Sequence, residues 1–218
     1  MMKRIQLAAL SFQGALWLLM LPLVVVFALV PVICMVMIAE VGAANAIHGI
    51  VSRLQTFIPV FVVCWQMGFL REQLEQEGNE VLFVYQHSGR SRLGEVLTLA
   101  GLYSLCILGV IAVMEIAFGL RLLHIMPLRL GIQCLFFSAL FYAVACMVRN
   151  IGMALIVVLV YYFVAAFYSV GTSLESISIF QFMKSMAIPG INAVDLIVAV
   201  FSAVLLYVGY RAIEGELK

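Results

Sequence analysis

The sequence predicts an all-α membrane protein that crosses the bilayer several times, and two observations support this fold class. Hydrophobic residues make up 66% of the 218 residues and charged residues only 11%, whereas about a quarter of the residues in soluble domains are charged. The apolar residues are gathered in unbroken runs of about 20 residues, the length that crosses roughly 30 Å of hydrocarbon as a helix. Because these runs lack the polar and apolar alternation of barrel strands, only helices satisfy their backbone groups.

Six apolar runs predict six membrane spans within a single transmembrane domain, residues 1–218. The expected spans are Leu16–Ile38, Leu54–Leu70, Val96–Met114, Leu130–Val148, Ile151–Val170 and Ala193–Tyr210. The first run is longer than the apolar core of a signal peptide, so we interpret it as a retained first span. Only Arg149 and Asn150 separate the fourth and fifth runs, which predicts a tight antiparallel hairpin.

The distribution of Lys and Arg predicts the orientation, because cytoplasmic connections carry the excess of basic residues. With the N-terminus inside, the cytoplasmic side holds eight of them: Lys3, Arg4, Arg71, Arg90, Arg92, Arg149, Arg211 and Lys218. The outer side holds four: Arg53, Arg121, Arg129 and Lys184. We therefore expect both termini in the cytoplasm and the protein in a cell membrane, either a bacterial inner membrane or a plasma membrane.

Three segments outside the spans have distinct compositions. Residues 1–15 mix basic and apolar side chains, which is typical of an interfacial helix on the inner leaflet. Residues 171–190 are too apolar for an ordinary aqueous loop, so we expect an outer re-entrant or surface hairpin. Residues 71–95, between the second and third spans, form the longest hydrophilic connection and hold about a third of the charged residues.

Within this connection the sequence predicts an amphipathic helix followed by a turn. At 100° per residue, one arc collects Leu74, Gly78, Val81, Leu82 and Tyr85. The opposite side carries Glu72, Glu75 and Glu80. His87–Glu95 then supplies turn residues and two arginines before the third span. Such a helix suits docking of a partner protein on the cytoplasmic side, although a charged inner loop that only fixes topology is the open alternative.

A family resemblance appears at these residues. The pattern Glu-x-Glu-Gly-x-Glu-x-Leu is followed by Ser-Arg and a long apolar helix; its members are Glu75, Glu77, Gly78, Glu80, Leu82, Ser91 and Arg92. This pattern resembles the cytoplasmic coupling helix of type-2 ATP-binding-cassette (ABC) exporter permeases. The wider layout is similar too: an interfacial N-terminal helix, six spans, both ends inside and a semi-apolar outer hairpin before the last span.

The resemblance implies a permease subunit that moves its substrate by alternating access, driven by a separate ATPase. Two such subunits, identical or different, would pair with two ATPase subunits, which would bind ATP and Mg²⁺. The residues expected to contact the ATPase are Glu75, Glu77, Gly78, Glu80, Val81, Leu82, Phe83, Tyr85, Ser91 and Arg92. The chain contains no G-x-x-x-x-G-K-[ST] motif for a nucleotide. We therefore expect no enzyme activity and no cofactor in this chain.

Other features leave alternatives open. No His, Cys or carboxylate pair has metal-ligand spacing, and a net charge of +1 without a basic stripe argues against nucleic-acid binding. Glu115 and Asp195 are the acidic residues closest to the membrane interior, where charges often mark a pathway or a pair. Pro22, Pro31 and Pro59 predict kinks in their spans. A secondary transporter, a membrane scaffold and, with less support, an intramembrane enzyme are the alternative functions; the substrate is not readable.

Overall fold

The computed structural model describes residues 16–74, 89–119, 127–168 and 193–214, and these residues form helices with no strand among them. The α-helices are α2 (Leu16–Val24), α3 (Val30–Val41), α4 (Ala43–Phe57), α5 (Val62–Leu74), α7 (Gly89–Phe118), α8 (Pro127–Val148), α9 (Ile151–Phe163) and α10 (Ala193–Glu214). Two π-helical segments, η2 (Val25–Leu29) and η4 (Val164–Tyr168), and one 3-10 segment, η3 (Pro59–Phe61), continue these helices. The predicted interfacial helix (1–15) and outer hairpin (171–190) lie outside the described residues.

Five of the helical stretches are long and apolar enough to cross a membrane. They are Met20–Val41, Gly49–Arg71, Arg92–Phe118, Pro127–Val148 and Val194–Ile213. In the helix expected as the fifth span, the apolar stretch within the described residues is Ile151–Phe167. At 1.5 Å per residue this part is about 25 Å long, less than the roughly 30 Å of a hydrocarbon core. The all-helical membrane fold is confirmed, and the count of six spans stays a prediction.

Two helices begin before the predicted starts of their spans, α4 by about three helical turns and α7 by about two. The second long helix begins at Ala43 and not near Leu54, because Gly42 alone makes the turn from α3 with a φ of +78°. The apolar side chains of Ala46, Ile50 and Leu54 are fully buried against the rest of the bundle. Polar residues in α4 lower the local hydropathy. A search for apolar runs therefore places the start of this helix too far along the sequence.

The third long helix begins at Gly89, so the predicted turn over His87–Glu95 is wrong for residues 89–95, which are helical. The reason is tertiary. Arg92 and Val96 are buried and Leu93 packs against the core, so this polar stretch gains packing contacts by continuing the helix. The resulting α7 has 30 residues, which makes it about 45 Å long.

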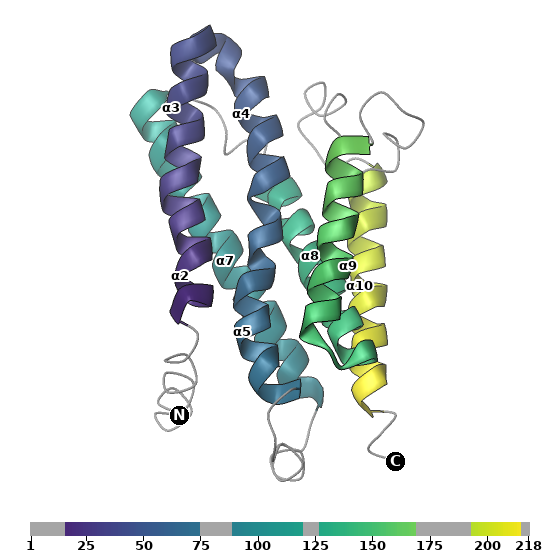
Figure 1. Ribbon diagram of the computed structural model, residues 1–218. Helices are drawn as coiled ribbons and strands as arrows, with labels where there is room; N and C mark the ends of the chain where they lie inside the picture. Colours follow the sequence, from purple (N-terminus) through teal and green to yellow (C-terminus); the bar gives the residue numbers. More distant parts are fainter. Residues whose placement is uncertain (1–15, 75–88, 120–126, 169–192, 215–218) are drawn as a thin grey trace.

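The helices pack around α8, which contacts α5, α7, α9 and α10. Most of its side chains are buried, and Ala139, Ala143 and Ala145 let neighbouring backbones approach closely. On one flank, the α2–α3 helix pairs with the α4–α5 helix, α2 against α5 and α3 against α4 (Figure 1). On the other flank, α9 and α10 each contact α8.

The predicted hairpin between the fourth and fifth spans is confirmed. Arg149 has a φ of +55°, and the Asn150 side chain caps α9 by accepting a hydrogen bond from the backbone N–H of Met153 at 2.9 Å. An asparagine cap satisfies one of the backbone donors that the first helical turn leaves unpaired. The turn therefore brings α9 back along α8 with no loop between them.

At one of the three predicted kinks, Pro59, the α-helical structure is interrupted. Pro59 starts the 3-10 segment between α4 and α5, where its missing N–H breaks the α-helical hydrogen bonding. Tyr103 of α7 donates a hydrogen bond to the carbonyl of Ile58 at 2.8 Å, so the break is held by a neighbouring helix. Pro22 and Pro31 lie on either side of the π-helical segment η2.

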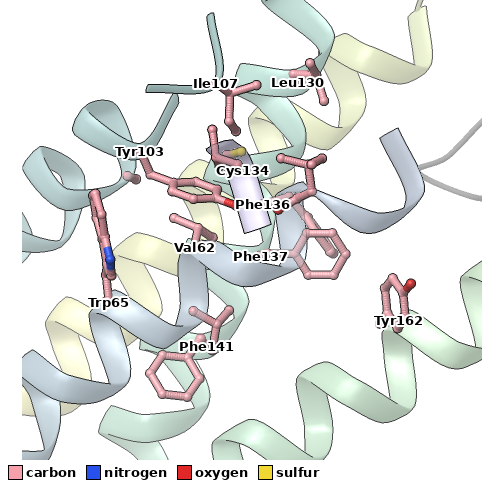
Figure 2. Packing of buried hydrophobic residues seen from close by; sticks show 14 of the residues in the cluster. Val62, Trp65, Tyr103, Ile107, Leu130, Cys134, Phe136, Phe137, Phe141 and Tyr162 are labelled. Carbon is pink, nitrogen blue, oxygen red and sulfur yellow. Dashed lines mark hydrogen bonds between the residues drawn. The ribbon is translucent and has the colours of Figure 1, made fainter. Parts of the chain in front are cut away.

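Aromatic rings fill the centre of the bundle (Figure 2). Trp65 of α5 and Tyr103 of α7 meet edge to face, with ring centroids 5.6 Å apart. Phe136 of α8 contacts Tyr161 of α9 at 5.0 Å and Phe201 of α10 at 6.3 Å. These aromatic contacts therefore connect α8 to both α9 and α10.

One end of the bundle, at the bottom of Figure 1, holds the start of α2, the end of α5, the start of α7, the turn between α8 and α9, and the end of α10. The residues that flank segment 75–88 therefore lie at the same end as Leu16 and Glu214. Arg71, Arg92, Arg149 and Arg211 belong to helix ends on this side. The helix ends that flank segment 75–88 thus lie at the same end of the bundle as the first and last described residues, and the side of the membrane that they face stays a prediction.

Cysteine labelling tests which side this is. Ser88→Cys lies in segment 75–88, and Glu40→Cys replaces an exposed residue at the end of α3, on the opposite end of the bundle. We expect a membrane-impermeant maleimide to label Glu40→Cys on intact cells and Ser88→Cys only after permeabilisation. The five native cysteines provide the background control, since all are free thiols within helices. Labelling of Ser88→Cys on intact cells would contradict the predicted orientation.

Candidate functional site

Segment 71–95 divides into three parts in the structure. Residues 71–74 complete α5 and residues 89–95 form the first turns of α7, whereas residues 75–88 lie outside the described residues. Eight of the ten predicted ATPase contacts fall in this last part: Glu75, Glu77, Gly78, Glu80, Val81, Leu82, Phe83 and Tyr85. Ser91 and Arg92 lie in the first turns of α7.

Arg92 is buried among the helices, with 5% of its surface exposed. Cys146 and Tyr142 of α8 lie near its side chain, as does Glu95 one turn further along α7. Cys146 and Tyr142 are themselves buried. In this structure Arg92 therefore contacts its own bundle, and a contact between Arg92 and an ATPase stays a prediction.

A second group of polar contacts lies near the middle of the bundle. Gln66 of α5 donates a hydrogen bond to the hydroxyl of Ser138 of α8, and both residues are fully buried. Ser138 is ten residues from the end of α8, or about 15 Å along the helix. At this depth lipid offers no hydrogen-bond partner, so polar side chains are satisfied only by neighbouring helices. The contact joins α5 to α8.

The Tyr103 hydrogen bond to Ile58 belongs to the same region, because Tyr103 is in the middle of α7. Cys134 of α8 lies close to the Tyr103 side chain, as Figure 2 shows, and interacts with Ser104 as well. Together with Gln66 and Ser138, these residues connect α5, α7 and α8 through polar contacts in an otherwise apolar core.

An ion pair joins α8 and α10 at the opposite end of the bundle. Arg129 Nη2 lies 3.3 Å from Asp195 Oδ2, and both side chains are less than a tenth exposed. Each residue lies in the first turn of its helix. The carboxylate is favoured at that position by the positive end of the α10 dipole. The sequence left open whether Asp195 marks a pathway or a pair, and the structure shows a pair; its partner Arg129 was expected in an outer loop.

The α8–α10 contacts follow a constant register. Arg129 pairs with Asp195, Phe136 stacks on Phe201, and Tyr142 packs against Gly209. These partners are 65 to 67 positions apart in the sequence, as expected for two parallel helices. A Cβ atom added at Gly209 would lie 2.8 Å from two ring carbons of Tyr142 and 3.1 Å from the Cα of Ala143. Gly209 therefore permits the close approach of α10 to α8.

Sequence reasoning did not identify Gln66, Ser138, Tyr103 or Gly209. Their partners are 45 to 72 positions away, and an isolated Gln, Ser or Gly inside an apolar run does not indicate what it faces. Glu115 is half-buried near the end of α7, and Arg121, which is near enough in the sequence to pair with it, lies outside the described residues. Within the described part of the chain, no group of three or more His, Cys, Asp or Glu residues could hold a metal ion.

These polar groups join helices to one another. Amide, hydroxyl and guanidinium groups form contacts between helices at three depths of one bundle, and each contact includes α8 or the helix break at Pro59. Comparison with known proteins finds no match to a protein-family model, to a curated protein or to a solved structure.

Proposed function

We propose that the chain is the permease subunit of an ABC transporter and that a separate ATPase docks on segment 71–95. The direction of transport, export, is proposed from the family resemblance alone. The proposal depends on the two helices that this segment connects. It connects the end of α5 to the start of α7 at one end of the bundle, and both helices contact the central α8. A movement imposed on segment 75–88 would act on two helices that reach the core.

The length of α7 supports this role. At about 45 Å, it exceeds the roughly 30 Å of the hydrocarbon core, so part of the helix projects beyond the membrane. Glu95 and Gly94 are exposed near its start, and Arg92–Phe118 is the longest of the five candidate membrane spans. A continuous helix transmits a displacement at its projecting end into the bundle.

The electrostatics of the segment suit a basic groove on a partner. Segment 75–88 carries three carboxylates, Glu75, Glu77 and Glu80, and no Lys or Arg. Complementary charge mainly sets association rate and register. The apolar residues Leu82, Phe83 and Tyr85 would supply most of the binding free energy, at about 25 cal/mol per Å² of buried apolar surface before the costs of association.

Association with an ATPase tests the proposal. The tagged chain is purified in mild detergent from its native source, and the bound proteins are assayed for ATP hydrolysis. We expect an ATPase to co-purify with the wild-type chain. Glu80→Arg reverses a charge in the docking segment, and Phe83→Asp removes its largest apolar side chain, so each is expected to lower ATPase recovery at least about tenfold, the equivalent of 1.4 kcal/mol.

The matched control is Glu40→Arg, which makes the same charge reversal on an exposed residue at the opposite end of the bundle. It should leave ATPase recovery unchanged. If Glu80→Arg and Phe83→Asp also leave recovery unchanged, the docking segment is wrong. If no ATPase co-purifies with the wild-type chain, the proposed function is wrong, and a secondary transporter or a scaffold becomes the better interpretation.

A further inference from the structure

Two neighbouring helices depart from α-helical structure at the same depth of the bundle. The π-helical segment η2 lies between α2 and α3, and the 3-10 segment η3 lies between α4 and α5. Because α2 packs against α5 and α3 against α4, both segments lie at the junction of the two pairs. Pro31 follows η2 and Pro59 begins η3. Sharp bends in helices occur at prolines and at π-helical segments, so each segment can act as a hinge.

The two segments divide this flank of the bundle into halves (Figure 1). In the half that contains α2 and α5, α5 contacts α7, α8 and α9, and Gln66 donates a hydrogen bond to Ser138 of α8. In the other half, α3 and α4 have their most extensive contact with each other, and α3 also contacts α7. The first half is therefore attached directly to the central helix, whereas the second is attached mainly to itself.

The second half, which we call the α3–α4 hairpin, is closely packed within itself. Gly42 makes its turn, and the Gly42 N–H donates a hydrogen bond to the carbonyl of Ile38 at 2.9 Å. A Cβ atom added at Gly49 would overlap the Cε of Met37, so the Met37 side chain lies directly against the α4 backbone. Close-packed groups have little free space in which to shift independently. The hairpin would therefore move as one unit.

A hydrogen bond from α7 stabilises the hinge at Pro59. The Tyr103 hydroxyl donates to the carbonyl of Ile58, the residue before Pro59, at 2.8 Å, and both Tyr103 and Ile58 are fully buried. The same helix, α7, also contacts η2. α7 therefore supports both hinges, and the Tyr103 hydroxyl is the group that a single-atom change can remove.

A buried amide of α4 favours a second arrangement of the hairpin. Gln55, one helical turn before Pro59, is 1% exposed. Within the described part of the chain, its Nε2 has no hydrogen-bond partner. A buried donor without a partner is costly, because it has lost its hydrogen bonds to water. Movement of the hairpin away from the bundle would let water reach this amide and would remove that cost.

We propose that the α3–α4 hairpin is a gate, which swings as one unit about η2 and η3 and is held closed by the hydrogen bond from Tyr103 to Ile58. The gate opens at the end of the bundle opposite the end of α5 and the start of α7 (Figure 1). Opening uncovers the Gln55 amide. This inference goes beyond the proposed function, because the movement is defined by contacts within this chain and needs no ATPase.

Distances between pairs of spin labels, measured by double electron–electron resonance on the full chain in lipid nanodiscs, test the gate. The gate pair, Glu40→Cys with Leu128→Cys, joins the end of α3 to the start of α8. The reference pair, Arg71→Cys with Arg211→Cys, lies at the other end of the bundle, and all four positions are exposed. Labelling of the wild-type chain gives the background from the native free thiols. We expect two distances for the gate pair and one for the reference pair.

Tyr103→Phe removes only the hydroxyl. It should raise the ratio of the longer to the shorter gate distance about fivefold, the equivalent of one hydrogen bond. The matched control, Tyr207→Phe, removes a hydroxyl from an exposed ring of α10 and should resemble wild type. Pro59→Ala restores a backbone donor, lets α4 continue into α5 and should lower the ratio. Amide hydrogen–deuterium exchange over residues 62–74 should be the same in all variants, since that half stays attached to α8.

An unchanged ratio in Tyr103→Phe would overturn the inference, and so would an equal change in the reference pair. A higher ratio in Pro59→Ala would also overturn it, because a continuous helix should oppose the swing. Each of these results leaves the proposed function standing, since ATPase recovery is measured separately.

Discussion

Asp195→Ala is expected to lower the free energy of unfolding by about 3–5 kcal/mol, the cost of breaking a buried ion pair by removing one partner. Asp195 Oδ2 and Arg129 Nη2 are 3.3 Å apart, and both side chains are almost completely buried. The substitution leaves the Arg129 charge at the α8–α10 contact without its carboxylate. Unfolding in detergent micelles by increasing fractions of a denaturing detergent measures the loss.

Two controls separate charge from packing. Replacing both residues, Arg129→Met with Asp195→Leu, removes the buried charges together and should recover most of the lost stability, because apolar side chains of similar volume often substitute well for a buried pair. Glu40→Ala removes an exposed carboxylate and should change stability by no more than about 0.5 kcal/mol. A loss below about 1 kcal/mol for Asp195→Ala would mean that the pair contributes little.

Gly209→Val is expected to destabilise the bundle by about 1–3 kcal/mol or more, the range for forcing extra carbons into a packed core. Its Cβ would overlap the Tyr142 ring, and because it would also lie 3.1 Å from the Cα of Ala143, a shift of the ring alone does not make room for it. The thermal midpoint of the detergent-solubilised protein should fall. Separation of α8 from α10 should also increase exchange in both helices over residues 142–148 and 206–213.

The matched control is Gly101→Val in α7. Gly101 is exposed, and a Cβ there would meet no atom within 4 Å. Only the difference in helix propensity remains, a fraction of a kcal/mol in favour of the substitution. Combining Gly209→Val with Tyr142→Ala should recover part of the stability, since it removes the ring. If Gly209→Val and Gly101→Val have the same midpoint, the close approach at Gly209 is not a constraint on the fold.

The predicted spans show where hydropathy is informative and where it fails. The end of α8 at Val148 and the hairpin at Arg149 and Asn150 agree with the prediction, because a polar pair between two apolar runs is a local signal. The starts of α4 and α7 do not agree. Both begin in polar stretches that are helical because one face packs on neighbouring helices, and packing between distant segments leaves no trace in a hydropathy window.

In the candidate site, too, some features follow from local sequence and others from contacts with distant residues. The amphipathic pattern of segment 71–95 and its resemblance to a coupling helix are local, and they led to the proposed docking surface. The orientation of Arg92 is not local. Its neighbours Tyr142 and Cys146 are about fifty residues away, so the sequence presented it as a residue for a partner protein, whereas the structure places it against α8.

The sequence by itself determined that the chain is a helical membrane protein, because lipid forces each long apolar run to satisfy its own backbone hydrogen bonds within a helix. It also determined the turn at Arg149, because the polar pair Arg149 and Asn150 separates two apolar runs. Only the tertiary structure decided which helices touch. The register of α8 on α10 depends on Arg129 meeting Asp195 and on Gly209 fitting Tyr142. Complementarity of shape and charge across 65 or more residues is a property of the packed surfaces, and neither partner alone specifies it.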